Sequence, residues 1–299
     1  MDLVAELSDR LLFAIPKKGR LHQKCLDLLE NIDVQFNRKP RHDIALSSNL
    51  PIAILFLPAS DIAKYVADGD VDLGITGQDI IVESEASDKV NELLSLGFGK
   101  CLLQVQAPVR NAQIIKAEDL IGKRIVTSFP VLAAKYFKEL ESTKGDTLLT
   151  QINFVSGSVE AACSLGLAQG IVDLVESGET MRAAGLHPVG TIMKSEAVLI
   201  SNTKTSHPDL IKKLKSRMEG ALLAKKYVIC TYNISRDKLA DATAVTPGRK
   251  APSVSPLESS GWVAVTVMIL KADEATIMDK LKEIGAEDIM VTHMVNCRA

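Results

Sequence analysis

The sequence EAACSLGLAQGIVDLVESGETM, residues Glu160 to Met181, combines a helical pattern, a strand and a glycine turn. Small and apolar residues at helical spacing precede Gly170, which we expect to end the helix. The apolar run Ile171–Val175 has the length of a buried strand and contains one acid, Asp173. The polar residues Glu176–Thr180 then supply hydroxyls, a glycine and, if a helix starts there, unpaired N–H groups. The segment predicts a phosphate-binding loop at the end of a buried strand.

A second segment, ADGDVDLGITGQD from Ala67 to Asp79, repeats this pattern. Identical residues recur at a constant offset in the pairs Ala67/Ala168, Gly69/Gly170, Val71/Val172, Asp72/Asp173, Leu73/Leu174 and Gly77/Gly178. The repeat indicates two α/β lobes of similar plan, each with a strand end and a glycine loop at a shared cleft. The alternative is that both segments are a common helix-to-strand junction of α/β proteins.

The length and composition leave room for several compact units. A chain of 299 residues with 46% hydrophobic residues can bury two or three cores. We expect lobe I over residues 1–105 and about 190–207, lobe II over 106–189, a Lys-rich connector helix over 208–226 and a third unit over 227–299. Strands over 98–105 and 193–201 are expected to cross between the lobes and form a hinged cleft.

The third unit has a different order of elements. The pattern predicts strand 227–233, helix 236–243, strands 253–256 and 262–270, helix 274–284 and strand 288–294. This βαββαβ order is the ferredoxin-like plan. Modules of this plan bind small regulatory molecules at paired interfaces, although the fold alone does not show regulation.

A basic glycine turn follows the first predicted strand, Leu11–Ile15. The turn Lys17–Arg20 has the sequence KKGR and precedes the amphipathic helix Leu21–Glu30. This order puts Lys17 and Arg20 beside N–H donors at the carboxyl end of a strand, where open α/β sheets bind ligands. The turn therefore favours a polyphosphate ligand. A solvated basic turn is the alternative.

Three further acids have a functional and a structural interpretation. Asp72 and Asp79 lie around the first glycine loop, where they could order a metal-phosphate or contact a base. Alternatively, Asp72 satisfies local backbone donors and Asp79 caps a helix, which we favour for Asp79. Glu160 lies in the first turn of a helix, where the dipole favours an acid whatever the function.

Charge and motifs exclude several functional classes. A net charge of -2 and 4% aromatic residues argue against a nucleic-acid partner. The sequence contains no P-loop motif, no G-x-G-x-x-G and no G-x-S-x-G. The scattered histidines have no metal-ligand spacing and are His22, His42, His187, His207 and His293. We expect neither a resident metal nor a covalent nucleophile.

Cysteine usage and the N-terminal sequence bear on the compartment. The cysteines are far apart and without zinc-type spacing, so we expect reduced thiols at Cys25, Cys101, Cys163, Cys230 and Cys297. The start, MDLVAELSDR, is acidic where a signal peptide is basic, and no apolar run approaches the roughly 20 residues of a membrane span. These features predict a cytoplasmic protein without a membrane partner.

Together these motifs resemble the long-form ATP phosphoribosyltransferase family, which begins histidine biosynthesis, over nearly the whole chain. The residues that fit the family signature are Glu160, Gly166, Ala168, Ile171, Asp173, Leu174, Ser177, Gly178, Thr180 and Met181. Other family-like segments are Pro16–Leu21, Asp72–Gly77, Phe98–Cys101 and Thr246–Gly248 with Pro252. The pairs Tyr232-Asn233 and Gly248-Arg249 resemble the fungal members.

The resemblance implies a fold and a reaction. The fold is a two-lobed α/β region like the type II periplasmic binding proteins, followed by an ACT-like ferredoxin domain. In the reaction, N1 of ATP displaces pyrophosphate from C1 of phosphoribosyl pyrophosphate, with Mg²⁺ carried mainly on the substrate phosphates. Histidine is the implied feedback inhibitor, and the implied assembly is a homo-oligomer, a dimer or hexamer. The alternatives are a solute-binding receptor without turnover and a phosphoribosyltransferase for another base.

The resemblance also assigns site residues. Its catalytic residues are Lys17, Arg20, Glu160 and Asp173. Its substrate-binding residues are Gly19, Asp72, Gly74, Thr76, Gly77, Ser177, Gly178, Glu179 and Thr180. Its effector-binding residues are Asn233, Ser253 and Asp288. Some members have an acid at the position of Asn233, so Asp288 is the other candidate for the charge that meets the effector's ammonium.

Overall fold

The computed structural model describes residues 6–39, 41–142 and 149–298, so the first half of the acidic start MDLVAELSDR lies outside it. The chain forms two compact units. Unit 1 comprises Met1–Asp27 and Gln35–Ile211, and unit 2 comprises Leu28–Val34 and Lys212–Ala299. Helices α2 (His22–Asn31) and α8 (Pro208–Lys226) contribute residues to both units. Among the described residues no helix is long and apolar enough to cross a membrane.

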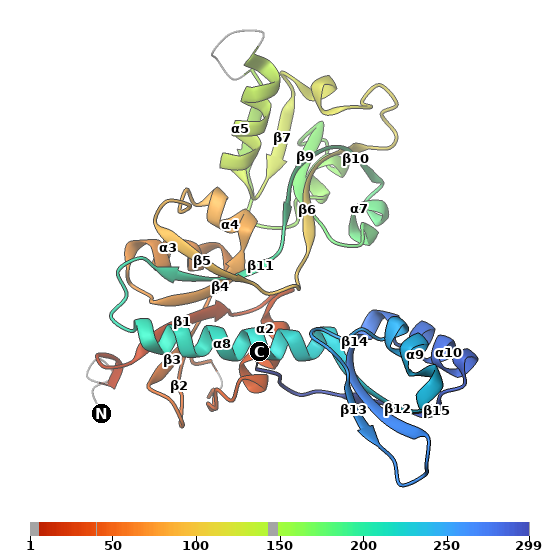
Figure 1. Ribbon diagram of the computed structural model, residues 1–299. Coiled ribbons are helices and arrows are strands. Elements are labelled where there is room, and N and C mark those ends of the chain that lie inside the picture. Colours follow the sequence, from red (N-terminus) through yellow and green to blue (C-terminus); the bar gives the residue numbers. More distant parts are fainter. Residues whose placement is uncertain (1–5, 40, 143–148, 299) are drawn as a thin grey trace. The chain divides into compact units, whose positions relative to one another are not determined.

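Lobe I of unit 1 is built on one mixed sheet with the strand order β2-β3-β1-β4-β11-β5 (Figure 1). Its strands are β1 (Leu11–Pro16), β2 (Ile44–Leu46), β3 (Ile52–Leu57), β4 (Leu73–Gly77), β5 (Val90–Ser95) and β11 (Ala197–Asn202). Strand β1 is parallel to both β3 and β4, and β11 runs antiparallel to β4. Its other helices are α3 (Ala59–Asp68) and α4 (Gln78–Glu83). The carboxyl ends of β1 and β4 therefore meet at one edge of the sheet.

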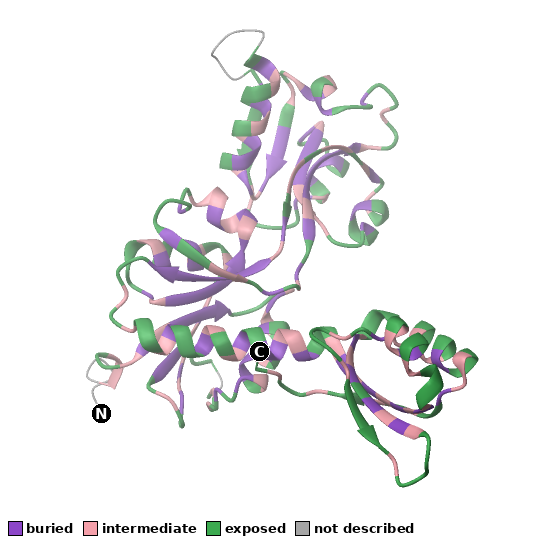
Figure 2. Cartoon of the chain, in the orientation of Figure 1, coloured by how far each residue is buried: buried purple, intermediate pink, exposed green. Residues whose placement is uncertain are grey.

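Lobe II is built on a second sheet with the order β10-β6-β9-β7-β8. Its strands are β6 (Cys101–Pro108), β7 (Arg124–Thr127), β8 (Gln151–Phe154), β9 (Gly170–Val175) and β10 (Leu186–Ser195). Its helices are η1 (Ala117–Leu120), α5 (Pro130–Glu141), α6 (Ala161–Ser164) and α7 (Glu179–Ala183). Strand β4 is buried along its whole length, and β9 is buried over its first three residues and half-buried over the rest (Figure 2). Two α/β lobes joined by two crossings form the type II periplasmic-binding-protein-like fold.

The two crossings overlap the segments predicted to cross, 98–105 and 193–201, but they do not coincide with the predicted lobe boundaries. The chain passes between the sheets at residues 96–100 and at Glu196, so the predicted limits at 105/106 and 189/190 fall inside β6 and β10. The predicted strand 193–201 is in fact the end of β10 and the start of β11. The break has a physical cause, because the backbone of Glu196 bonds Gln78 of α4 instead of a sheet neighbour. Another link joins the lobes where Glu83 accepts the N–H groups of Val131 and Leu132.

The helix predicted before Gly170 is shorter than expected. Helix α6 covers only Ala161–Ser164, and Gly166 adopts a φ of 73°, which breaks the helical path well before Gly170. Leu165 is 71% exposed and Leu167 is 56% exposed, so these leucines form no buried helical face. The prediction of a helix up to residue 169 is wrong, whereas the strand Ile171–Val175 is confirmed within β9.

The prediction of a loop over Asp72–Gly77 is also wrong. Residues 73–77 form the central strand β4, and every residue of this strand is buried. A Cβ at Gly74 would lie 2.8 Å from Ile62 Cγ2, so this glycine allows helix α3 to pack on the strand. Thr76 is 0% exposed. The substrate-binding roles predicted for Gly74 and Thr76 do not fit these buried positions inside lobe I.

Asp72 lies at the amino end of β4, away from the edge where the strands lead into the cleft. Its Oδ2 accepts the N–H of Leu12 at 2.9 Å, and its Oδ1 accepts the hydroxyl of Thr205 at 2.7 Å. Asp72 and Asp173 are therefore not structurally equivalent, although their segments match at a constant offset in sequence. Asp72 precedes its strand, whereas Asp173 lies within β9. Both hydrogen bonds fit the structural interpretation of Asp72, and its predicted substrate contact stays a prediction.

Unit 2 confirms the predicted ferredoxin-like order. It contains β12 (Tyr227–Ser235), η3 (Arg236–Lys238), α9 (Leu239–Val245), β13 (Ser253–Pro256), β14 (Trp262–Leu270), η4 (Lys271–Asp273), α10 (Glu274–Ile284) and β15 (Glu287–His293). The sheet order is β13-β14-β12-β15 with antiparallel neighbours. Alternate residues of β12 are buried, as expected when one sheet face packs on helices. Tyr232 is fully buried, and its hydroxyl is 2.8 Å from that of Thr246.

The two hydrogen bonds of Asp72 predict a stabilising role. We expect Asp72→Ala to lower the free energy of unfolding by about 1–3 kcal/mol, because it leaves the Leu12 N–H and the Thr205 hydroxyl without their acceptor. Urea unfolding measures this change. Thr205→Ser keeps the hydroxyl and serves as the matched control with near wild-type stability. A stable Asp72→Ala protein with a raised KM for either substrate would contradict the structural role.

Candidate functional site

Three strands deliver the predicted site segments to the cleft of unit 1. Strand β1 leads into the turn Lys17–Arg20, and β4 leads into α4, which begins at Gln78. In lobe II, β9 leads into Glu176–Thr180. Parallel strands present their carboxyl ends at the same edge of a sheet, so each lobe contributes one such edge to the cleft.

Arg20 is one of the residues that join the two lobes. Its Nη1 donates to the carbonyl of Gly99 at 3.0 Å and to Glu176 Oε1 at 2.8 Å, and its Nη2 lies 3.9 Å from Asp79 Oδ2. Burial alone lowers the pKa of Arg20, but its hydrogen bond to Glu176 and the nearby Cys101 and Asp79 raise the pKa above its usual value. The guanidinium is therefore a permanent positive charge in the cleft.

Lys17 has a weaker attachment than Arg20. Its Nζ is 2.8 Å from Asp43 Oδ1, but the lysine side chain is 44% exposed and that of Asp43 is 50% exposed. Exposed ion pairs of this kind contribute about 0–1 kcal/mol, so an anionic ligand can displace Asp43. Gly19 has a φ of 90° and open space around it, which shapes the turn that carries both cations.

Asp173 and Glu160 form an acidic pair in lobe II. Asp173 Oδ1 accepts the N–H of Leu174 at 2.8 Å. Burial raises the pKa of Asp173 to about 6, the Leu174 hydrogen bond opposes this shift, and the Glu160 carboxylate adds to it. Glu160 lies at the N-cap position of α6 but makes no side-chain capping hydrogen bond there. Carboxylate oxygens at such positions are ligands suited to Mg²⁺ or to ribose hydroxyls.

The predicted phosphate loop has an exposed polar surface. Ser177, Glu179 and Thr180 are exposed, whereas Gly178 is buried with a φ of 76°. This left-handed residue turns the chain into α7, whose first N–H groups project from the helix. Arg182, which no sequence motif marked, also supports this loop, because its Nη2 donates to the carbonyl of Ser177 at 3.1 Å. Its position one helical turn after Gly178 was the available signal.

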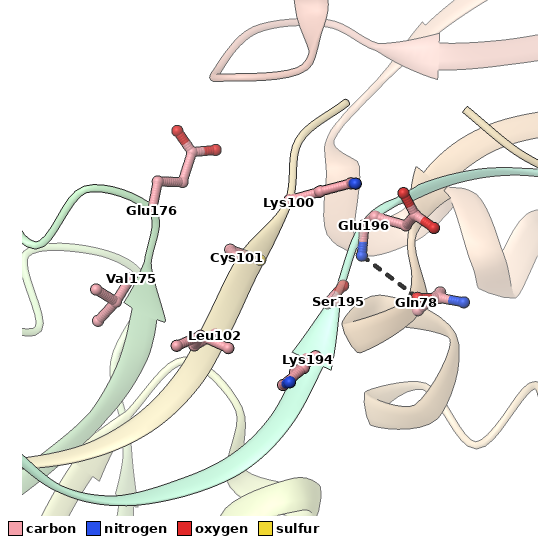
Figure 3. A pocket seen from close by; sticks show the side chains of 9 residues that line it. All are labelled: Gln78, Lys100, Cys101, Leu102, Val175, Glu176, Lys194, Ser195 and Glu196. Carbon is pink, nitrogen blue, oxygen red and sulfur yellow. Dashed lines mark hydrogen bonds between the residues drawn. The ribbon is translucent and has the colours of Figure 1, made fainter. Parts of the chain in front are cut away.

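A cavity of about 360 Å³ lies beside these groups (Figure 3). Its walls come from both crossings, from α4 and from the end of β9, and they comprise Gln78, Lys100, Cys101, Leu102, Val175, Glu176, Lys194, Ser195 and Glu196. Burial raises the pKa of the Cys101 thiol, and the adjacent Arg20 offsets part of that rise. The Phe98–Cys101 motif pointed to one wall, but no motif marked Lys194 or Ser195.

Unit 2 brings two of the predicted effector residues together. Asn233 Nδ2 donates to Asp288 Oδ2 at 2.9 Å, at a register irregularity between β12 and β15. Asp288 has a φ of 47°, which turns it out of the regular strand pattern. Ser253 is exposed on β13 and pairs with Thr266 of β14, and no hydrogen bond described in the structure joins it to the other two.

The fold and these groups define a two-lobed protein whose cleft suits a phosphorylated, polyanionic ligand. Comparison with known families sharpens that class. Residues 58–220 match the model of the HisG family, ATP phosphoribosyltransferase, and residues 224–296 match its C-terminal domain. ATP phosphoribosyltransferase of Yarrowia lipolytica is 55% identical and that of Saccharomyces cerevisiae 52% identical, both over the full length of each chain.

A solved structure has a similar fold over most of this chain. The ATP phosphoribosyl transferase (HisG:HisZ) complex of Thermotoga maritima aligns with a TM-score of 0.57 and 26% identity, covering 70% of this chain and 98% of that chain. The chain belongs to the ATP phosphoribosyltransferase family. Its activity is that of a pentosyltransferase at the first step of histidine biosynthesis.

The raised pKa of Asp173 predicts a pH-dependent cost in stability. The unfolded chain ionises this acid near 3.8 and the folded chain near 6, so stability falls as pH rises through that window. We expect Asp173→Asn, which cannot ionise, to be more stable than wild type at pH 8 by on the order of 1–2 kcal/mol, with a smaller gain at pH 5. Unfolding in urea at both pH values measures the difference.

The control for this effect is Asp70→Asn, which removes an exposed carboxylate from the same unit. It is expected to change stability little at either pH. A loss of stability in Asp173→Asn at pH 8 would mean that the ionised carboxylate holds the loop in shape, contrary to the prediction.

Proposed function

We propose that the cleft of unit 1 binds phosphoribosyl pyrophosphate between Ser177–Thr180 and the turn Lys17–Arg20. The exposed hydroxyls of Ser177 and Thr180 and the N–H groups in the first turn of α7 suit the 5-phosphate of the sugar. The cations Lys17 and Arg20 suit the pyrophosphate, because their present partners Asp43 and Glu176 are exposed carboxylates that an anion can replace. Arg20 bridging the lobes is the observation that carries this proposal.

We assign the ribose and its Mg²⁺ to the acidic pair. Asp173 and Glu160 are close enough for one carboxylate to raise the pKa of the other, and a cation between them relieves that repulsion. Their oxygen donors fit Mg²⁺, which in this proposal arrives with the substrate and neutralises charge on its phosphates. The chain's own contribution is to orient the ribose so that its C1 faces the nucleotide.

The nucleotide is assigned to the cavity lined by Lys100 and Lys194. These lysines come from the two crossings and can meet the phosphates of ATP. We assign the nucleotide to this cavity in place of the segment Asp72–Gly77. Residues 73–77 of that segment form the buried strand β4, and Asp72 lies at the amino end of the strand. Gly77 keeps a place at the rim, because it directly precedes Gln78 of the cavity wall.

The reaction needs alignment more than a base. The lone pair of adenine N1 forms a bond to C1 of the ribose while the C1–O bond breaks, and the electron pair leaves with pyrophosphate. No proton has to be removed from N1 for this step. Arg20 and Lys17 therefore act by stabilising the negative charge of the leaving group, and the phosphate loop holds C1 in line.

We further propose that histidine inhibits the enzyme by binding near Asn233, Asp288 and Ser253 in unit 2. The Asp288 carboxylate can accept the effector's ammonium, and Asn233 already orients that carboxylate. The same proposal includes a homo-oligomer, a dimer or hexamer, because regulatory modules of this plan act in pairs. A cytoplasmic location is inferred from the thiols, since none of the five cysteines forms a disulfide.

The activity itself predicts a specific product. With ATP, phosphoribosyl pyrophosphate, Mg²⁺ and pyrophosphatase, the protein should generate the absorbance of an N1-substituted adenine. We expect Ser177→Ala with Thr180→Val to raise the KM for phosphoribosyl pyrophosphate by about 10–100-fold, because hydroxyls that hold the 5-phosphate are lost. The KM for ATP is expected to stay near the wild-type value.

Ser164→Ala is the matched control, since it removes an exposed hydroxyl from α6 of the same lobe. Absence of the chromophore in wild type, or pyrophosphate release with a different base, would refute the assigned reaction. An equal rise in both KM values would instead refute the assignment of the loop to the sugar phosphate.

The effector assignment makes a separate prediction. We expect Asp288→Ala to raise the histidine concentration for half-inhibition at least about tenfold, because a charge-assisted hydrogen bond to the ammonium is worth about 1.5–3 kcal/mol. The rate without histidine is recorded on the same sample, and inhibition is expressed as the ratio of the rates with and without histidine. Asp279→Ala removes an exposed acid from α10 and should leave inhibition as in wild type. Unchanged inhibition of Asp288→Ala would contradict the site.

A further inference from the structure

Asp79 is an acid buried at the hinge of unit 1. It lies in the first turn of α4 and is 1% exposed. Its Oδ1 accepts the Ser195 hydroxyl at 2.7 Å, and its backbone N–H donates to the same Ser195 oxygen at 3.1 Å. Ser195 is itself 4% exposed and ends β10 just before the second crossing. The pair therefore fixes the start of α4 to the crossing between the lobes.

Helix capping does not explain this arrangement. The N-cap of α4 is Gly77, and no side-chain cap hydrogen bond is present at this helix start. The Asp79 carboxylate instead lies over the backbone of Gly77, where an added Cβ would collide with its Oδ1. Gly77 has an ordinary φ of -84°, so a glycine is required here for space and not for backbone conformation. The sequence thus makes room for the carboxylate at a specific place.

The charge that faces this carboxylate is Arg20. Its Nη2 lies 3.9 Å from Asp79 Oδ2, and burying an ionised acid without an opposite charge is costly. The guanidinium has two kinds of acidic neighbour. Asp79 is buried and held by Ser195, whereas Glu176 is 45% exposed and lies at the cavity wall (Figure 3). An incoming anion can displace Glu176 but leaves Asp79 in place.

We propose that Asp79 and Ser195 are positioning residues that orient the Arg20 guanidinium toward the departing pyrophosphate. The inference deepens the proposed function and rests on its assignment of Arg20. Arg20 Nη1 donates to the Gly99 carbonyl and Nη2 faces Asp79 at 3.9 Å, so the guanidinium keeps both of these neighbours when a substrate anion takes the place of Glu176. Ser195 acts one step further away by fixing the carboxylate that faces Arg20.

The test combines substitutions with a measurement that does not require turnover. Affinity for magnesium pyrophosphate is measured by calorimetry, and kcat and both KM values are measured where the protein is active. Asp79→Asn keeps the shape and removes the charge, Ser195→Ala removes the hydroxyl, and Ser195→Thr keeps it. We expect Asp79→Asn and Ser195→Ala to weaken pyrophosphate binding and raise the KM for phosphoribosyl pyrophosphate by about 10–100-fold, because a misplaced guanidinium no longer meets the anion.

A double-mutant cycle separates positioning from general structure. In an Arg20→Ala background, Asp79→Asn should cause no further loss of pyrophosphate affinity, since its effect passes through the missing guanidinium. Ser195→Thr should retain wild-type affinity. Losses that multiply in the double variant, or unchanged affinity in Asp79→Asn, would overturn the inference.

The outcomes remain distinct from a failure of the proposed function. If wild type binds pyrophosphate but forms no N1-substituted product, the proposed reaction fails while the cycle still tests the positioning. If wild type is active and Asp79→Asn does not fold, Ser195→Ala and Ser195→Thr supply the same comparison. Equal pyrophosphate affinity in those two variants would then refute the role of the pair.

Discussion

The guanidinium of Arg20 joins the parts of unit 1 on which binding depends. It follows β1 of lobe I, contacts the first crossing at Gly99 and reaches Glu176 at the end of β9 in lobe II. Because an arginine stays charged at any physiological pH, this contact cannot be released by losing a proton. It can only be exchanged for another anion. In the proposed function, association of the lobes and binding of a polyanionic substrate therefore use the same charge.

The course of the strands explains why distant segments meet at that charge. Strands β1 and β4 run parallel, so the basic turn and the start of α4 emerge at the same edge of lobe I. In lobe II, β9 runs parallel to β7 and leads into the loop Ser177–Thr180 at the carboxyl edge of that sheet. The contact of Glu83 with the start of α5 adds a second link between the lobes. The polar and charged residues of such a cleft lie on short turns that directly follow the strands of the two sheets.

How much the sequence could predict depended on the range of the interaction. Every strand and both main helices of the βαββαβ unit were predictable, because alternation such as that of β12 reports a locally half-buried sheet. The positions of the loop Ser177–Thr180 and of the basic turn Lys17–Arg20 after their strands were likewise predicted from local chemistry, and their ligands stay a prediction. The helix before β9 was overextended, because the positive φ of Gly166 is a backbone property that its pattern does not reveal. Pairs such as Asp79 with Ser195 have no periodicity, since only the folded sheets bring them together.

Asp72 and Asp173 show why identical sequence context did not fix a role. A carboxylate can accept about four hydrogen bonds. Each oxygen of Asp72 accepts one hydrogen bond within lobe I, from the Leu12 N–H and from the Thr205 hydroxyl. The hydrogen bond described for Asp173 engages one oxygen with its own neighbour, while burial and Glu160 raise its pKa to about 6. An acid whose oxygens accept hydrogen bonds from the fold stabilises the fold, whereas one with fewer such bonds keeps acceptor capacity that a ligand could use. The different environments of the two acids thus follow from their positions on the strands, which the shared D-L motif does not encode.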